Sequence, residues 1–176
     1  AHGLSEDEYE RVLKALGRNP VFNAAAIPFR ILPPLFNRYD VGMKFDAHVD
    51  GAIRAIPQAG GMRMRADVST TIFLTEPDEY EGGELVVEDF YGEQRLKPPA
   101  GTAVIYPSTS LHRVTEVTRG SRWASFFWTQ SLVKDPFGRA LLYDLDMAIT
   151  NVRRELPDTN RSVVQFTSVY HNLLRR

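Results

Sequence analysis

The chain has 176 residues, of which 43% are hydrophobic and 24% are charged, and its formal net charge at pH 7 is −1. This length is typical of one ordinary globular domain, and the balanced charge gives no general attraction to nucleic acid or to anionic membranes. Cysteine is absent, which excludes disulfides, thiolate catalysis and cysteine-ligated metals. A metal site would therefore use His, Asp or Glu.

The sequence contains no candidate membrane segment. No run approaches the roughly 18 apolar residues that a membrane span needs, and the start, residues 1–4, lacks a basic stretch followed by an apolar one. We therefore expect a cytoplasmic protein with no membrane partner.

The first predicted element is a helix over residues 5–16. Ser5 and Glu8 have the spacing of a capping box, and Leu4 and Tyr9 have that of a hydrophobic staple. Gly17 follows as a C-terminal stop.

From Phe29 onward the sequence is typical of an all-β region. Short runs rich in Ile, Val, Phe and Thr alternate with glycine and proline turns, which predicts six to eight strands. The clearest runs are Val68–Leu74, Glu84–Val87, Thr102–Tyr106, His112–Val117 and Trp123–Thr129. Regularly spaced strands without intervening helices favour a closed or double-sheet antiparallel architecture, for which a jelly roll is the natural candidate.

After Pro136 the apolar period becomes helical. It predicts one helix up to Leu156 and, beyond the break at Pro157 and Asp158, a second helix over residues 159–174. The apolar stripes of these helices need a partner. We therefore expect a core over residues 1–135 and a helical hairpin over residues 136–176, packed on the barrel or on a neighbouring subunit of a homo-oligomer.

Two histidines and one aspartate are candidate metal ligands. In an extended segment, residues i and i+2 point to the same side, so His48 and Asp50 can face one ion. His112 begins a later predicted strand, at a distance along the chain that a barrel can close. Two histidines and one carboxylate on one face of an octahedral ion leave three open positions, as in non-heme iron(II) oxygenases. Zinc hydrolases use the same ligand types.

Arg122 distinguishes these two classes. It lies on the last predicted strand, in phase with Ala124, Phe126 and Trp128, on a face that is expected to be buried. A buried guanidinium requires an anion, and its planar fork can hold a carboxylate through two hydrogen bonds. A dicarboxylate cosubstrate would explain the charge.

These candidates belong to a longer ordered pattern, namely Tyr39-x-x-Gly42-x-x-Phe45-x-x-His48-x-Asp50, then Gly82-Gly83-Glu84-Leu85, His112 and Arg122. The pattern resembles that of the prolyl-hydroxylase-like 2-oxoglutarate oxygenases. More narrowly, the chain is similar to the bacterial PKHD-type hydroxylases from about Leu13 to Asp146. The stretches that carry this closer likeness are Pro33–Tyr39, Thr75–Leu85 and Tyr106–His112.

The resemblance implies that His48, Asp50 and His112 bind iron(II) and that Arg122 binds the distal carboxylate of 2-oxoglutarate. We take Tyr39 as a candidate for a further hydrogen bond to this cosubstrate. The family's fold is a double-stranded β-helix, and its reaction uses O2 to hydroxylate a substrate with release of succinate and CO2. Ascorbate is the expected reductant.

The chain departs from its relatives at two points. Eukaryotic prolyl hydroxylases typically have lysine where this chain has Arg122, so collagen-type substrates are not implied. Family members also usually carry a longer N-terminal segment than the one present here, and whether activity requires that segment is open.

Two other functions use the same scaffold. One is a cupin-like metalloenzyme that does not use 2-oxoglutarate, and the other is a non-catalytic β-helix protein that binds iron or a ligand. Cupin sequences usually carry paired histidines and a glutamate in one motif, which this chain lacks, and its triad is intact. A hydroxylase is therefore favoured, with an unidentified substrate that is not expected to be nucleic acid. Arg63 and Arg65 follow Ala59-Gly60-Gly61 and could form a lid over the site.

Overall fold

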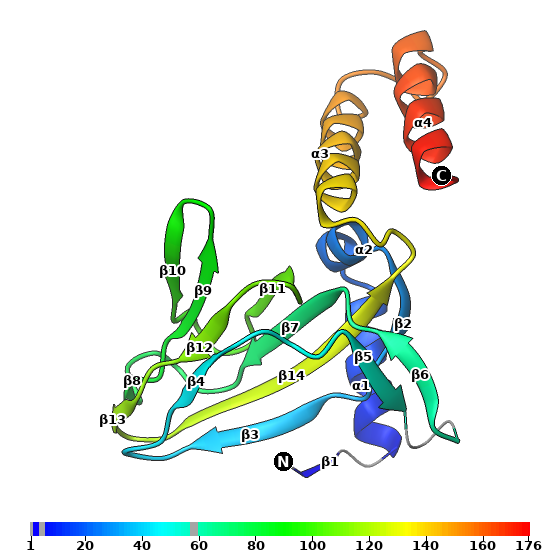
Figure 1. The fold of residues 1–176 in the computed structure, drawn as a ribbon. Coiled ribbons are helices and arrows are strands. Elements are labelled where there is room, and N and C mark those ends of the chain that lie inside the picture. The colour runs from blue at the N-terminus through cyan, green and yellow to red at the C-terminus, as the bar shows by residue number, and fades with distance from the viewer. Residues whose placement is uncertain (1, 4–5, 57–59) are drawn as a thin grey trace.

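The computed structural model describes residues 2–3, 6–56 and 60–176, which form four helices and fourteen strands (Figure 1). The helices are α1 (Glu6–Gly17), α2 (Pro20–Ala26), α3 (Pro136–Val152) and α4 (Arg161–Leu174). The strands are β1 (His2–Gly3), β2 (Pro28–Ile31), β3 (Leu35–Tyr39), β4 (Phe45–His48), β5 (Ile53–Ile56), β6 (Met62–Arg65), β7 (Val68–Phe73), β8 (Glu81–Gly82), β9 (Leu85–Asp89), β10 (Gly92–Leu96), β11 (Ala103–Pro107), β12 (His112–Val114), β13 (Val117–Arg119) and β14 (Arg122–Ser131). In these ranges no helix has both the length and the apolar character needed to span a membrane.

Two antiparallel sheets form the body of the molecule. The larger sheet has the order β1-β3-β14-β7-β11, with β2 also paired to β14, and the smaller has the order β10-β9-β12-β4. Two short hairpin-like pairs, β13 with β8 and β5 with β6, complete the strands. The mainly β architecture with flanking helices, predicted as a double-stranded β-helix, is confirmed.

Apolar side chains fill the molecule on both sides of the larger sheet. On the outer side, Leu16 of α1 and Phe22 of α2 pack against Val68 and Phe127 of the sheet. On the inner side, a second cluster joins the two sheets through Phe73, Leu85, Val87 and Tyr106. The larger sheet is therefore buried on both faces, which explains why β7 shows no clean alternation of apolar and polar residues.

The strand count exceeds the six to eight that the sequence predicts. The run His112–Val117, expected as one strand, is divided because β12 pairs with β4 and β9, whereas β13 pairs with β8. The other expected runs match β7, β9, β11 and β14 within two residues at either end. Short pieces such as β5, β6 and β10 have only four or five residues each, which is too few for an alternating pattern to be recognised.

The helices follow the sequence prediction with one omission. The helix predicted over residues 5–16 is α1, but the proposed cap and staple involve Leu4 and Ser5, which lie outside the described residues. Helix α2 was not predicted, although Asn19 followed by Pro20 is a start signal. The Asn19 side chain accepts a hydrogen bond of 3.0 Å from the Phe22 N–H.

The C-terminal helices form the predicted hairpin, which projects from the sheets in Figure 1. Helix α3 packs against α2, and α4 packs against α3. Buried Arg139, in the first turn of α3, donates hydrogen bonds to the carbonyl oxygens of Val133 (2.8 Å), Lys134 (3.1 Å) and Asp67 (3.2 Å). The start of the hairpin is therefore fastened to the backbone next to β7.

Gly82 and Gly83 allow β8 and the turn after it to lie close to Glu116 and Arg122. Both have a left-handed backbone, with φ of 67° and 61°. A Cβ on Gly82 would overlap the carbonyl oxygen of Glu116, and one on Gly83 would lie 3.0 Å from the Arg122 Cδ. The two glycines thus let β13 and the Arg122 side chain pack directly against the turn.

We expect Gly82→Ala to lower the free energy of unfolding by on the order of 3 kcal/mol, because backbone strain adds to overlap with Glu116. Gly101→Ala is the matched control, since Gly101 also has positive φ (83°) but a Cβ there meets nothing within 4 Å. The control should lose only about 1–2 kcal/mol. Urea unfolding measures both, and equal losses would show that the close approach is unimportant.

Candidate functional site

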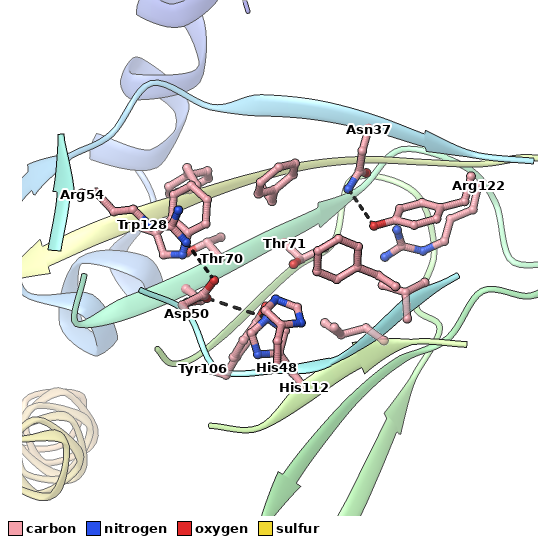
Figure 2. A pocket seen from close by; sticks show the side chains of 17 residues that line it. Asn37, His48, Asp50, Arg54, Thr70, Thr71, Tyr106, His112, Arg122 and Trp128 are labelled. Atoms are coloured by element: carbon pink, nitrogen blue, oxygen red, sulfur yellow. Dashed lines mark hydrogen bonds and ion pairs between the residues drawn. The ribbon is translucent and has the colours of Figure 1, made fainter. Parts of the chain in front are cut away.

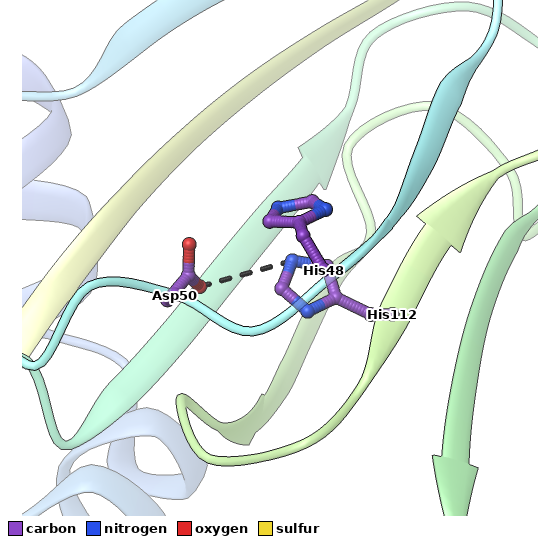
Figure 3. Close-up of side chains that lie close together, drawn as sticks. All are labelled: His48, Asp50 and His112. Carbon is purple, nitrogen blue, oxygen red and sulfur yellow. Dashed lines mark ion pairs between the residues drawn. The ribbon is translucent and has the colours of Figure 1, made fainter.

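His48, Asp50 and His112 converge at one end of the smaller sheet (Figure 3). The antiparallel pairing of β4 with β12 sets His112 directly opposite His48, and their ring centroids are 4.2 Å apart. One ligand atom from each of the three side chains lies within 4.8 Å of the other two. The three residues can therefore contact a single metal ion, although 64 positions of chain separate the two histidines.

Each histidine is oriented by a backbone carbonyl. The Nδ1 of His48 lies 2.9 Å from the Asp46 oxygen, and the Nδ1 of His112 lies 3.0 Å from the Ser110 oxygen. A proton on Nδ1 satisfies each carbonyl and leaves the Nε2 lone pair for a metal. Burial lowers the pKa of His112, which favours the neutral form that metal binding requires.

Asp50 is held by a hydroxyl group of β7, which a second hydroxyl supports from the turn after β11. Ser69 Oγ donates a hydrogen bond of 2.6 Å to Asp50 Oδ2. Ser69 Oγ also lies 2.8 Å from Ser108 Oγ, and Ser108 is the donor there because the Ser69 proton is already used. The carboxylate is fixed with Oδ2 3.8 Å from the His112 Nε2. The set of two imidazoles and one oriented carboxylate fits the ligands of an iron(II) site.

Arg122 is a buried cation with no acidic partner in the described part of the chain. Its side chain, at β14, is only 1% exposed, and it faces the rings of Tyr39 at 5.5 Å and Phe73 at 4.9 Å. Within the described ranges, its Nε and Nη2 have no partner in hydrogen-bond geometry, and neither does the buried Tyr80 hydroxyl. Burial lowers the pKa of Arg122, although the Tyr80 hydroxyl lies close enough to raise that pKa in part. An uncompensated buried charge is costly, so these donors favour an anionic ligand.

One cavity of about 360 Å³ connects Arg122 to the metal-ligand candidates (Figure 2). Its walls are mainly apolar, with a few convergent polar groups, as in typical small-molecule sites. The lining side chains are Asn37, Tyr39, Phe45, His48, Asp50, Arg54, Ser69, Thr70, Thr71, Leu85, Tyr106, His112, Val114, Arg122, Phe126, Phe127 and Trp128. All five residues singled out from the sequence line this cavity.

Tyr39 lies beside Arg122, because β3 pairs with β14 in a register that sets these two residues opposite each other. Its hydroxyl accepts a hydrogen bond of 3.3 Å from Asn37 Nδ2. Burial raises the pKa of Tyr39, and that of Tyr106 to about 12. Both phenols therefore stay protonated near neutral pH and can donate hydrogen bonds into the cavity.

Sequence reasoning missed Asn37, Ser69, Tyr106 and Arg54. Asn37 and Tyr106 lie inside the stretches that resemble the hydroxylase family, so spacing from Tyr39 and His112 could have suggested them. Ser69 had no signal in a run of buried strand residues. Arg54 Nη2 lies 3.3 Å from Asp50 Oδ1, four residues along the chain, and nothing in the local sequence indicates that contact.

The expected lid arginines do not enter the cavity. Arg65 Nε donates to Asp67 Oδ1 at 2.5 Å, and its Nη2 donates to the Ser131 carbonyl at 3.2 Å. Arg63 is exposed and does not line the cavity. Ala59, part of the proposed hinge, lies outside the described residues. A lid role for this segment stays a prediction.

Comparison with known proteins gives matches over nearly the whole chain. Residues 34–130 match the model of the 2OG-Fe(II) oxygenase superfamily, and residues 138–176 match that of the PKHD-type hydroxylase C-terminal domain. A PKHD-type hydroxylase of Methylobacterium nodulans is 66% identical over 95% of this chain and 73% of its own length. One from Gluconobacter oxydans is 65% identical over the same shares.

Solved structures show the same fold. A Pseudomonas putida prolyl-4-hydroxylase superposes with a TM-score of 0.52 at 23% identity, covering 74% of this chain and 70% of that one. A 2OG-Fe(II) oxygenase family oxidoreductase from Burkholderia pseudomallei gives a TM-score of 0.52 at 22% identity, over 69% of this chain and 57% of that one.

We expect Ser69→Ala to weaken Mn²⁺ binding by about tenfold or more, because Asp50 loses the donor that orients it. Isothermal titration with Mn²⁺ measures the change. Ser125→Ala is the matched control, since its hydroxyl is also buried on the larger sheet but has no hydrogen-bond partner among the residues that the structure describes. Equal effects of the two variants would rule out a specific role for the Ser69 hydroxyl.

Proposed function

The chain belongs to the PKHD-type hydroxylases of the 2OG-Fe(II) oxygenase superfamily, and we propose that His48, Asp50 and His112 hold its iron(II) while Arg122 binds 2-oxoglutarate. It is a dioxygenase that hydroxylates a substrate and releases succinate and CO2. Its substrate class is not fixed by the family, because one scaffold serves many substrates.

The buried Arg122 is the observation that carries the assignment of residues. Its unsatisfied Nε and Nη2 belong to the same cavity as the metal-ligand candidates. Two hydrogen bonds from a guanidinium to one carboxylate match a dicarboxylate cosubstrate. A cupin-like site that does not use 2-oxoglutarate would leave this charge without a counterion, and we therefore set that alternative aside.

The protein's own contribution is to hold and orient. Bound iron(II) with 2-oxoglutarate and dioxygen supplies the oxidising chemistry. Arg122 fixes the distal carboxylate, and Tyr39, with its hydroxyl proton free because that oxygen accepts from Asn37, donates a further hydrogen bond to the cosubstrate. Apolar walls such as Leu85, Val114 and Phe126 limit water around the reacting groups.

We propose three finer features on the same basis. Ascorbate serves as reductant, the protein works in the cytoplasm, and residues 136–176 form a unit distinct from residues 1–135.

Part of this C-terminal unit is unpartnered: Phe166, Val169, Tyr170 and Leu173 of α4 have the spacing of one helical face. Three of them, Phe166, Val169 and Leu173, are 41% to 50% exposed. A second copy of the chain would cover this face in a homo-oligomer.

Val169→Glu should dissociate that oligomer, because a charge on a buried apolar interface is costly. The matched control is Val164→Glu, since Val164 is similarly exposed at 53% but lies on another side of α4. Light scattering coupled to gel filtration gives the mass of each variant. A wild-type chain that is monomeric at all concentrations would contradict the oligomer.

Succinate formation from 2-oxoglutarate in air, with iron(II) and ascorbate, tests the site. We expect His48→Ala and His112→Ala to abolish it together with iron binding, while His171→Ala on α4 is unaffected. Arg122→Met, which keeps the bulk but removes the charge, should raise the KM for 2-oxoglutarate on the order of 100-fold. Its turnover should recover partly at high 2-oxoglutarate.

A wild-type protein that binds iron(II) with all three ligands but never binds or consumes 2-oxoglutarate would overturn the assignment of Arg122. In that case the cavity would belong to a metal-binding protein of another kind.

A further inference from the structure

We propose that Arg54 binds a carboxylate of the substrate, so that this hydroxylase acts on an acid with an apolar body. The inference rests on the proposed function, because it takes the Arg122 end of the cavity as the 2-oxoglutarate end. It concerns the remaining end of the same cavity.

Arg54 lies across the metal-ligand candidates from Arg122. In Figure 2, Arg54 and Trp128 lie on one side of Asp50, and Arg122 and Asn37 lie on the other. All of these side chains line the cavity. With 2-oxoglutarate occupying the Arg122 side, the substrate must approach from the side of Arg54.

The Arg54 side chain is held rigidly with a donor to spare. Its guanidinium stacks on the Trp128 ring, 3.8 Å from the centroid, and its Nη2 lies 3.3 Å from Asp50 Oδ1. Its Nε is buried and has no hydrogen-bond partner within the part of the chain that the structure describes. A stacked arginine with an unused donor is suited to recognise a planar anion such as a carboxylate.

The charge balance of the cavity favours an anionic substrate. Asp50 is the only acid among the lining residues, against two arginines. A divalent metal ion and a doubly negative 2-oxoglutarate cancel each other, so the loaded cavity keeps one excess positive charge. One substrate carboxylate near Arg54 neutralises that charge, whereas a cationic substrate would be repelled.

The surroundings of Arg54 are apolar. Trp128 and Phe45 line the cavity, and Phe45 is 48% exposed. These apolar groups beside one cation match an acid that carries an apolar side chain.

Matched acid and amide probes test the proposal by binding rather than by turnover. The protein is loaded with Mn²⁺ and saturating 2-oxoglutarate, and N-acetyl-leucine is compared with N-acetyl-leucinamide by paramagnetic broadening of the probe's proton signals. Broadening reports that the probe lies near the metal and gives its Kd. A second pair, blocked tripeptides with a central glutamate or glutamine, distinguishes a small acid from an acidic side chain.

We expect the carboxylate of at least one pair to bind about tenfold more tightly than its amide, as a charge-assisted hydrogen bond predicts. In Arg54→Gln this preference should fall to about one. Arg63→Gln is the matched control, because Arg63 carries the same charge on the same hairpin but does not line the cavity. It should keep the wild-type preference.

Three results would overturn the proposal. The first is the absence of any acid preference in the wild-type protein, including no broadening of any probe, and the second is a preference that survives in Arg54→Gln. The third is a loss of Mn²⁺ affinity in Arg54→Gln that accounts for the whole effect, since Arg54 would then only hold Asp50. Titration of 2-oxoglutarate in the same samples distinguishes these results from failure of the proposed function.

Discussion

The antiparallel pairing of β4 with β12 sets His48 opposite His112, and that of β3 with β14 sets Tyr39 opposite Arg122. A shift of one residue in either register would turn these side chains to the other face of the sheet. Each pairing lies in one of the two sheets that the apolar cluster of Phe73, Leu85, Val87 and Tyr106 joins. The positions of the metal-ligand candidates and of the carboxylate-binding candidate are therefore properties of the sandwich as a whole.

Side chains outside the set of candidate metal ligands hold that set in position. Ser108 donates to Ser69, which donates to Asp50, and Ser108 also donates its backbone N–H to the Asp67 carbonyl. Arg139 at the start of α3 donates to that same oxygen. A continuous chain of hydrogen bonds thus runs from the C-terminal hairpin to the aspartate of the triad, which gives the hairpin a physical connection to the site.

The sequence was sufficient to predict the fold class and the helices α1, α3 and α4, and it singled out five candidate residues that all line one cavity. His48, Asp50 and His112 could be identified from the sequence, because alternation along a strand and the chemistry of metal ligands leave few options. Arg54 and Ser69 could not be identified in this way, because their contacts with Trp128 and Asp50 depend on how the strands are placed. The predicted lid role of Arg63 and Arg65 rests on the glycines that precede them. The register of the β5–β6 hairpin puts Arg54 on the face opposite these two arginines, and Arg54 is the one that lines the cavity.

The proposed role of the buried Arg122 would also link cosubstrate supply to the lifetime of the protein. A ligand that binds only the folded chain adds free energy of unfolding in proportion to the logarithm of its concentration. Because 2-oxoglutarate would supply a counterion for Arg122, the folded population would rise with the concentration of 2-oxoglutarate. If Arg122 holds 2-oxoglutarate, a shortage of it would leave more chains open to proteolysis, so that the amount of enzyme as well as its turnover would depend on the supply of the cosubstrate.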